Sequence, residues 1–563
     1  VETRLYKWDS EDPVLVLAFA DFVADSPKYE KLKSYLSPAV FTNRSGTVKP
    51  HVIPTITLTK KSANELNADF TWCHNQIHKK GDLSYTAAFM EFVKLVFLKL
   101  LSDREIHRRH PEFSDPSEKS ITLDASEVKF SLLWIENAEA LGTENPIDRI
   151  QFVDLVRNLE GEIKAGHKKR IFAADERIHL PAEVIRDVAE RLQETDLFGI
   201  DADLNGRLFE TFLNATLRGK SLGQYFTPRS VVKLATALGS LKVSPNLERC
   251  DRVLDACCGT GGFLIEALAD MWQKADGLRS LSAERRRELK DSIARECVYG
   301  IDSAKDPALA RIARINMYLH GDGGSRIYQF DSLDKKVSPR SDDSVEVKHE
   351  KQEFLSVLSE MDEGLVDVVL TNPPFAKEYE RPKPGSVVPP ELRILDDYET
   401  AFRGAGRKRK PKQKLRSSIM FLERYLDLLK PDGRLVTIID DSVLTADSYA
   451  EDREWLQEKY SVEAVISLPG DAFQRSQARV KTSILILRKK GTSSQSQADV
   501  FMYYCTAVGV DDPPRQRVLP IDEINHAAAI KEISDVTRLF HAFLDGDASA
   551  APWIVPGKAL GDR

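Results

Sequence analysis

Hydrophobic positions between residues 84 and 101 recur every three or four residues, which is the spacing of one face of an α-helix. Charged side chains fall between them, so this stretch predicts an amphipathic helix with one buried stripe. Similar spacing in "PAEVIRDVAERLQ" and "LNGRLFETFLNATL" predicts further helices between residues 150 and 240. We therefore predict a mainly helical domain over residues 71–205. The first stripe consists of Phe89, Phe92, Val93, Val96, Phe97 and Leu100.

Residues 1–70 have a different pattern. They contain short apolar runs such as "VLVLAF" and "HVIPTITLT", separated by turn residues, which is typical of short strands. We predict an α/β or irregular N-terminal segment here, and no motif in it indicates a chemistry.

From residue 250 onward, apolar runs of strand length alternate with helical patterns. This alternation predicts βαβ units that form a parallel, doubly wound α/β sheet. Residues 346–352 and 382–394 interrupt it and are predicted to be surface insertions. Residues 491–500 are predicted to be a flexible connector, so 491–563 would be a helical tail able to contact a partner. The predicted strands include "DRVLDACC", "CVYGID", "RIYQFDSL", "LVDVVLTNPPF", "GRLVTIID", "SVEAVISLP" and "KTSILILRK".

Composition narrows the class of protein. With 563 residues, 42% of them hydrophobic and 30% charged, the chain is typical of a globular protein of several domains. We find no membrane span, and the six cysteines form no C-x-x-C pair, which favours a reducing cytoplasm. The "HRRH" run at 107–110 lacks acidic or thiol companions, so we predict no metal site. The net charge of −7 argues against a uniformly basic surface but allows a local basic cleft.

The stretch "DVVLTNPPF" (367–375) is a buried-strand pattern that stops at two prolines. Proline lacks the N–H that a sheet needs and disfavours helix at the preceding residue, so Asn372 is predicted to be extended at the strand's carboxyl end. In open α/β sheets, ligands bind at that edge. The alternative is a simple strand terminator with Phe375 in the core.

A second candidate loop follows an earlier strand, in "VLDACCGTGGFLIEAL" (253–268). Gly259, Gly261 and Gly262 let the backbone approach a ligand without Cβ clashes. The pattern is not G-x-G-x-x-G, and no Lys-Ser or Lys-Thr pair follows it. A diphosphate is therefore not the expected ligand.

Three acids stand near the carboxyl ends of three predicted strands. Asp255 precedes the glycines and suits a positively charged amine, while Asp302 suits a pair of ribose hydroxyls. Asp331 could accept a hydrogen bond from the exocyclic amine of adenine. Together they fit a nucleoside that carries an ammonium and no phosphate, as S-adenosylmethionine (AdoMet) does.

The two loops together resemble the AdoMet-binding and catalytic motifs of amino-group DNA methyltransferases, in "DACCGTGGF" and "TNPPF". "GQYFTPRSVVKLA" (223–235) resembles a conserved block that precedes the glycine motif in one class of them. The downstream stretches "LLKPDGRLVTIIDDSVL" and "VEAVISLPGDAFQRSQARVKTSILILRK" resemble the modification subunits of type I restriction–modification systems. The family usually has Pro-Ala after the first acid, where this chain has Ala256 and Cys257.

The resemblance implies a Rossmann-like AdoMet-dependent methyltransferase domain over residues 206–490. It also implies a set of cofactor-binding residues. These are Tyr225, Phe226, Thr227, Asp255, Cys257, Gly259, Thr260, Gly261, Gly262, Phe263, Asp302, Asp331 and Asn372.

The resemblance further implies methyl transfer to the N6 amine of adenine in double-stranded DNA. The Asn372 side-chain oxygen and the Pro373 carbonyl would accept the two amine hydrogens, and Pro374 would stiffen the loop. Phe375 would be exposed, to stack on a base swung out of the duplex. Cytosine N4 enzymes often have Ser in place of the Asn, so adenine is favoured.

The run "RGAGRKRKPKQKLR" (403–416) contains eight Lys or Arg among its fourteen residues and could contact phosphates, or could be a solvated loop. Target recognition would come from a separate specificity subunit, and a restriction subunit could accompany it. Two alternatives are a non-catalytic DNA-binding or assembly subunit and a protein glutamine methyltransferase, whose motif generally has Tyr in place of Phe375. The predicted DNA contacts are Arg407, Lys408, Arg409, Lys410, Lys412 and Lys414.

Overall fold

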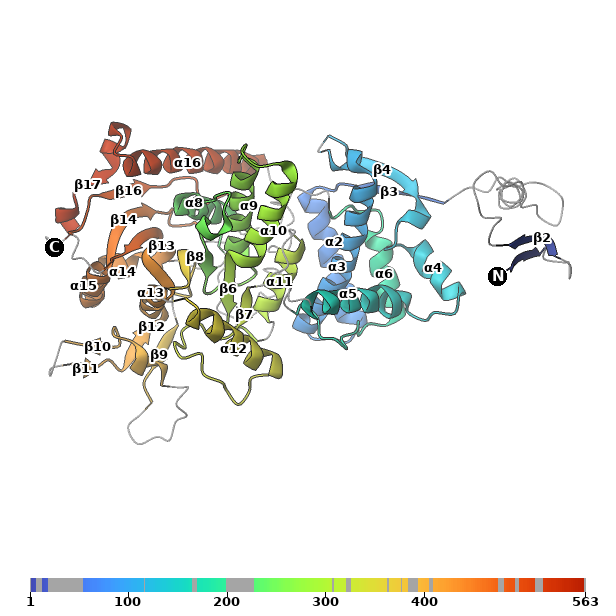
Figure 1. The fold of residues 1–563 in the computed structure, drawn as a ribbon, viewed down its shortest axis with the longest axis horizontal. Coiled ribbons are helices and arrows are strands. Elements are labelled where there is room, and N and C mark those ends of the chain that lie inside the picture. Colours follow the sequence, from blue (N-terminus) through green and yellow to red (C-terminus); the bar gives the residue numbers. More distant parts are fainter. Residues whose placement is uncertain are drawn as a thin grey trace.

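The structure is a computed structural model, and it contains a helical domain and a domain built on one large sheet (Figure 1). No helix among the residues it describes is long and apolar enough to cross a membrane. The described residues are 2–6, 13–18, 54–115, 117–164, 170–198, 227–305, 308–319, 326–361, 364–375, 377–382, 393–404, 409–473, 480–491, 496–511 and 520–560.

Two of the helices that the apolar spacing predicts are present in the helical domain, as α3 and α6, and the third, "LNGRLFETFLNATL" (204–217), lies outside the described residues. Ser62 begins α2 with a capping box, in which it and Glu65 satisfy each other's backbone N–H groups. Ser84 caps α3, whose apolar residues form the centre of the domain core. The elements are α2 (Ala63–Lys80), α3 (Tyr85–Arg109), α4 (Leu132–Ala140), α5 (Val153–Lys164), α6 (Ala182–Leu192), β3 (Thr55–Thr59) and β4 (Ser120–Asp124).

Helix α3 differs from the prediction of one buried stripe, because residues 91–100 are buried on all sides. Its charged side chains are paired inside the domain, as buried charges must be. Lys94 Nζ lies 2.7 Å from Glu91 Oε1, and Lys99 forms an ion pair with Asp103. Ion pairing therefore lets charged residues occupy the core-facing positions of a central helix.

The predicted boundary at residue 70 falls inside α2, so it is corrected. Strand β3 pairs antiparallel with β4 across the whole of both strands. Residues from 54 onward therefore belong to the helical domain. In the first segment, β2 (Pro13–Ala18) contains most of the predicted run "VLVLAF", and it pairs antiparallel with β1 (Glu2–Tyr6), which was not predicted.

The sheet domain is built on nine strands in the order β17-β16-β14-β15-β13-β8-β5-β6-β7. The pairs from β13 through β8, β5 and β6 to β7 are parallel, whereas β15 runs antiparallel to both β13 and β14. Strand β17 also runs antiparallel to its neighbour β16, so two reversed strands, β15 and β17, interrupt the parallel arrangement that we predicted. The strands are β5 (Val253–Asp255), β6 (Val298–Asp302), β7 (Ile327–Gln329), β8 (Val366–Thr371), β13 (Leu429–Asp440), β14 (Tyr460–Ser467), β15 (Thr482–Lys489), β16 (Val500–Tyr504) and β17 (Ile554–Val555).

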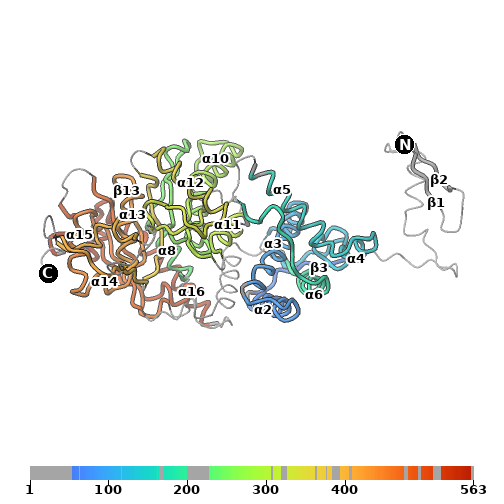
Figure 2. Tube along the Cα trace, turned by 90° about the horizontal axis from the view of Figure 1, so that it is seen from below, coloured from blue at the N-terminus to red at the C-terminus, as the bar shows by residue number. Residues whose placement is uncertain are grey.

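Helices cover both faces of this sheet, which makes it doubly wound. One apolar layer lies beneath α8, α9, α10 and α16, and a second lies beneath α12, α13 and α15. Helix α11 has a further role, because its Leu309, Ile312 and Ile315 are buried in the core of the helical domain. Figures 1 and 2 both show α11 beside α3, so this helix joins the two domains. The helices are α8 (Arg229–Gly239), α9 (Gly262–Asp276), α10 (Ala283–Glu296), α11 (Leu309–Leu319), α12 (Val345–Ser359), α13 (Ser417–Leu428), α15 (Ala450–Lys459) and α16 (Pro520–Leu544).

The predicted C-terminal tail is part of the same domain, and this corrects the boundary at residue 490. Strand β16 pairs parallel with β14, and β17 pairs with β16. Ile533, Leu539 and Phe543 of α16 pack against the apolar layer that α8 and α9 also cover. Residues 496–511 and 520–560 therefore complete the sheet domain.

The segment 346–352, predicted to be a surface insertion, lies within α12. Glu350 and Lys351 face inward there: Glu350 accepts a hydrogen bond from the Gln329 N–H at 2.7 Å, and Lys351 forms an ion pair with Asp343 at 2.5 Å. Residues 383–392 of the second predicted insertion lie outside the described residues.

Candidate active site

The two candidate loops meet where the strand order reverses. Strand β5 has β6 on one side and β8 on the other, and both of its neighbours are parallel to it. The glycine loop follows β5 and the Asn-Pro-Pro loop follows β8, so both leave the carboxyl edge of the sheet side by side. This switch point is where open α/β sheets bind ligands.

The glycine loop has backbone conformations that favour glycine. Gly259 and Gly261 have φ angles of 54° and 90°, and Gly261 is the N-cap of α9. A Cβ on Gly259 would meet nothing within 4 Å, so the backbone there borders open space. A ligand can therefore approach the main chain at Gly259 directly.

Asp255 is buried at the end of β5. Its Oδ1 accepts hydrogen bonds from Thr371 Oγ1 at 2.7 Å and from the Cys257 N–H at 3.1 Å. Burial raises the pKa of Asp255 to about 7, although these two hydrogen bonds lower it. The carboxyl group borders a cavity of about 410 Å³ beside the glycine loop, where a cationic ligand group would favour its ionised form.

Asp302, at the end of β6, holds the glycine loop from the other side. Its two oxygens accept hydrogen bonds from the N–H groups of Gly259, at 3.0 Å, and Ala304, at 2.9 Å. Burial raises the pKa of Asp302 to about 6. Asp331 follows β7, accepts a hydrogen bond from the Leu333 N–H at 3.1 Å, and lies 3.5 Å from Arg340 Nη2.

A cavity, with about 790 Å³ of empty space that includes open solvent at its mouth, brings these loops together. The predicted residues Cys257, Gly259, Asp302, Asp331 and Asn372 all line it. Its other lining residues are Ala256, Ser303, Leu309, Ser332, Pro373, Pro374, Lys377, Tyr379 and Phe421.

Asn372 has the one unusual hydrogen-bond arrangement among the described residues of this cavity. Its Nδ2 donates to Thr227 Oγ1 at 2.8 Å, which fixes the orientation of the amide. Its Oδ1 is buried and has no hydrogen-bond partner in the described part of the chain. An unsatisfied buried acceptor costs about 1–3 kcal/mol, so the protein maintains it at the expense of stability.

The rest of the Asn-Pro-Pro loop is fixed by the first turn of α13. Ser417 Oγ donates to the carbonyl oxygen of Pro374, and the Ser417 N–H donates to the carbonyl oxygen of Lys377 at 2.8 Å. These bonds hold the loop in place without a ligand, as preorganised catalytic loops require.

Phe375 corrects our expectation of an exposed aromatic. It is only 4% exposed and belongs to the apolar layer under α8 and α9, and it does not line the cavity. The alternative, a core residue that follows a strand, therefore describes its position. Its predicted role in stacking on a base would require it to move out of this layer.

The remaining predicted cofactor residues have mixed positions. Thr260 and Phe263 are buried beside the smaller cavity, and the Thr260 carbonyl accepts a hydrogen bond from Asn316 at 3.1 Å. Gly262 begins α9 and also borders that cavity. Tyr225 and Phe226 lie outside the described residues.

The basic segment is less free than its sequence predicts. Lys412 Nζ lies 2.8 Å from Asp452 Oδ1, with both side chains largely buried, and Lys414 forms ion pairs with Glu378 and Glu380. Lys412 therefore has a structural ion pair. Arg409 lies 4.0 Å over the ring of Phe402, and Lys410 is exposed on the short strand β11 (Lys410–Pro411). Arg407 and Lys408 are outside the described residues.

Sequence reasoning missed the wall of the cavity opposite the glycine loop. Lys377 and Tyr379 come from the segment directly after the Asn-Pro-Pro loop, and Phe421 comes from α13. Their only sequence signal was nearness to Asn372 or an apolar helical spacing, which core residues share. Thr371, the partner of Asp255, was likewise predicted only to end a strand.

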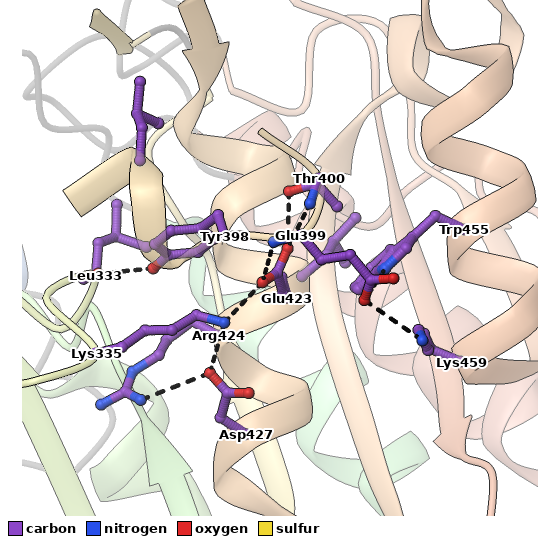
Figure 3. A network of polar contacts seen from close by, with 12 residues as sticks. Leu333, Lys335, Tyr398, Glu399, Thr400, Glu423, Arg424, Asp427, Trp455 and Lys459 are labelled. Carbon is purple, nitrogen blue, oxygen red and sulfur yellow. Dashed lines mark hydrogen bonds and ion pairs between the residues drawn. The ribbon is translucent and has the colours of Figure 1, made fainter. Parts of the chain in front are cut away.

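A network of buried polar contacts fixes the loop that carries Asp331 and Ser332 (Figure 3). Arg424 Nε donates to the carbonyl oxygen of Ser332 at 2.7 Å, and Tyr398 Oη donates to that of Leu333 at 2.7 Å. Glu423, on the same helix as Arg424, accepts hydrogen bonds from the N–H groups of Glu399 and Thr400. Helix α13 thus contacts this loop, the Asn-Pro-Pro loop and the segment around Glu399 and Thr400, and it holds the three together.

Comparison with known proteins finds methylase subunits of type I restriction enzymes. The chain is 22% identical over 407 residues to the type I restriction enzyme EcoEI methylase subunit of Escherichia coli, covering 69% of each chain. It is 24% identical over 442 residues to the StySPI methylase subunit of Salmonella potsdam, covering 76% of this chain and 68% of that one.

Among solved structures, the fold is similar to a modification subunit from Vibrio vulnificus YJ016. The TM-score is 0.52 at 20% identity, covering 84% of this chain and 90% of that one. A chain from a type I R-M system structure has the same TM-score at 18% identity, covering 89% of each chain. At this identity the likeness establishes the fold, a Rossmann-like methyltransferase sheet with a helical N-terminal domain.

The family comparison covers more than half of the chain. Residues 200–538 match the N-6 DNA Methylase family, a range that spans the sheet domain from the segment before α8 into α16. The glycine loop, the three acids and the Asn-Pro-Pro loop all lie inside it. The chain therefore belongs to the N-6 DNA methylase family.

Proposed function

We propose that this chain is the modification subunit of a type I restriction–modification system. Its reaction is the transfer of a methyl group from AdoMet, the methyl donor of this family, to N6 of adenine in DNA. The observation that carries the proposal is the buried Oδ1 of Asn372, which has no partner among the described residues and lines the same cavity as Gly259.

The chain's residues fit AdoMet. The backbone at Gly259 borders open space and lines the cavity, so a ligand can lie against it. The acids Asp255, Asp302 and Asp331 are each placed at a strand end around the two cavities. We assign Asp255 to the amine, Asp302 to the ribose and Asp331 to the adenine base.

When bound, AdoMet supplies an electrophilic methyl group. Adenine N6 is a weak nucleophile because its lone pair is delocalised into the ring. Asn372 Oδ1 and the Pro373 carbonyl oxygen accept hydrogen bonds from the two N–H groups of this amine. These hydrogen bonds favour a pyramidal nitrogen with an available lone pair. Thr227 keeps the oxygen of Asn372, and not its NH₂ group, directed at the substrate.

DNA contacts and partners are part of the proposal. Exposed Lys410 and Arg409 would contact phosphates, and a separate specificity subunit would choose the target sequence. The relatives are named as methylase subunits of type I restriction enzymes, which supports a restriction subunit as a further partner. Such a system works on DNA in the cytoplasm and defends its host against phage.

Transfer of label from AdoMet tests the proposal. The chain is incubated with radiolabelled AdoMet and duplex DNA, alone and with the specificity subunit from the same operon, and an Asn372→Ala variant serves as the control. Label in DNA as N6-methyladenine, dependent on Asn372, is the expected result. Label in protein instead of DNA would favour the glutamine methyltransferase alternative, and no transfer despite AdoMet binding would favour the assembly subunit.

A further inference from the structure

The wall of the active-site cavity opposite the glycine loop is built by a segment outside the family's sequence motifs. The segment between the catalytic loop and α13 is described at residues 377–382, 393–404 and 409–416. Within this segment, strand β9 (Glu378–Glu380) pairs antiparallel with β12 (Lys414–Arg416). Tyr379, in the middle of β9, lines the cavity together with Asn372, Asp302 and Asp331.

Tyr379 is held firmly in this position. It is the register partner of the buried Leu415, and it packs against the apolar layer beneath α13. Lys377, two residues earlier, is fixed through its carbonyl oxygen by the Ser417 N–H. Since both ends of β9 are anchored, the ring is preorganised as a wall.

The surroundings of Tyr379 identify which end of the cavity it faces. Tyr379 lines the cavity together with Asp331, whose carboxylate lies 3.5 Å from Arg340 Nη2. Burial raises the pKa of the Tyr379 phenol most, the charge of Asp331 raises it further, and the charge of Arg340 lowers it. Asp331 is the acid assigned to the adenine of AdoMet. On one face of the ring, Lys377 Nζ lies 4.6 Å from the ring centre.

The aromatic alternatives are less suitable. Phe375 is buried in the opposite apolar layer and does not line the cavity, and Phe421 is 4% exposed within α13. Tyr379 is only partly buried, so part of its ring is available to a ligand. A planar ring at an adenine-binding end can stack on the base, which adds to the affinity of small-molecule sites.

Building on the proposed function, we infer that Tyr379 is a cofactor-binding residue that closes the adenosine end of the AdoMet pocket. Lys377 lies against its ring and completes the wall. The segment that carries Tyr379, as well as the family motifs, then determines how tightly this chain binds its methyl donor.

Calorimetry with three ligands tests this inference. The ligands are AdoMet, S-adenosylhomocysteine and 5′-methylthioadenosine, and the last of these contains the adenosine end without the amino acid. Tyr379→Leu should weaken all three by about tenfold, because each loses the same stacking surface. Tyr379→Phe should bind all three nearly as wild type does.

A matched control exists on β16. Tyr504 is 57% exposed, has Lys481 Nζ 5.2 Å from its ring centre and does not line the cavity. Tyr504→Leu should therefore bind the three ligands normally. Thermal melting of each variant checks that the fold is intact. If Tyr379→Leu does not fold, Tyr379→Phe still tests the inference, because a phenylalanine variant that weakens binding by about tenfold contradicts stacking.

Three outcomes would overturn the inference. Unchanged dissociation constants with a raised KM for DNA would place Tyr379 against the target base. Weaker AdoMet with unchanged 5′-methylthioadenosine would place it at the amino-acid end. Equal losses in the Tyr504→Leu control would make the effect non-local. Wild-type protein that binds none of the three ligands would instead contradict the proposed function.

Discussion

Asn372 Nδ2 donates to Thr227 Oγ1 at 2.8 Å beside the smaller cavity, and this hydrogen bond joins the catalytic loop after β8 to the residues that precede α8. At this position the NH₂ group of the amide has a hydrogen-bond partner, and the oxygen has none among the described residues. Thr227 fixes the direction of this buried oxygen, which is available to a substrate amine.

Replacing Asn372 by Ala should leave AdoMet binding nearly unchanged and reduce methyl transfer by at least about 100-fold, the scale for one preorganised polar interaction. Calorimetry and a single-turnover methylation assay measure the two effects separately. Near-normal turnover in this variant would remove Asn372 from the catalytic site.

Thr227→Val should act through Asn372. Without the Oγ1 acceptor the amide can rotate, so we expect kcat to fall by about tenfold, the equivalent of one neutral hydrogen bond, with little change in the dissociation constant for AdoMet. Thr227→Ser keeps the acceptor and should restore kcat. Equal losses in the valine and serine variants would indicate a packing effect instead.

AdoMet binding should release protons near neutral pH. Burial raises the pKa of Asp255 to about 7 in the free protein, and a bound ammonium group would lower it again by favouring the carboxylate. The ligand thus binds the deprotonated form of Asp255 more tightly, so affinity should rise with pH up to about 7 and fall again above about pH 8, where the α-amino group of the ligand loses its proton. Titrations in buffers with different ionisation enthalpies measure the proton release, and Asp255→Asn should abolish it. A pH-independent affinity in wild type would separate Asp255 from the amine.

Much of this arrangement could be predicted from the sequence, because it depends on local patterns. The alternation after residue 250 predicts the doubly wound sheet, and its strand ends place Asp255, Asp302 and Asn372 together. Phe375 was predicted to be exposed, which is wrong, since an aromatic side chain after a strand suits a core and a stacking site equally. The structure decides between them by packing it under α8 and α9.

Two physical causes explain why the sequence did not predict some elements. The first is the burial of charged side chains through polar partners. Residues 346–352 of α12 were predicted to be a surface insertion because Glu350 and Lys351 are buried in this helix, at positions where a hydrophobic pattern is expected. Long-range pairing is equally invisible to periodicity. The pairing of β16 with β14 joins residues separated by the connector, so the C-terminal segment was predicted to be a tail.

The basic segment gives a prediction about salt dependence. If Arg409 and Lys410 bind phosphates, replacing both by Ala should flatten the slope of log affinity for DNA against log salt, by about 0.9 for each phosphate that is no longer neutralised. Arg285→Ala with Arg287→Ala on α10 is a control of equal charge, and its slope should match wild type. A slope unchanged by the first pair would make this segment a solvated loop.

The last prediction concerns target recognition. Reading base edges requires side chains from a helix, strand or loop module that buries on the order of 1,000 Å² of protein surface in a groove. In the sheet domain, the carboxyl edge around Asn372 is committed to the methyl donor and one flipped base. The described C-terminal residues are committed as well, because β16 extends the sheet and Phe543 of α16 packs into its apolar layer. We therefore expect the isolated chain to bind AdoMet but to methylate DNA weakly, and a specificity subunit to restore methylation at one adenine-containing sequence. Sequencing that detects N6-methyladenine, run on DNA treated with the chain alone and with that subunit, decides the matter: efficient methylation of a single motif by the chain alone would mean that the reading module lies within its own 563 residues.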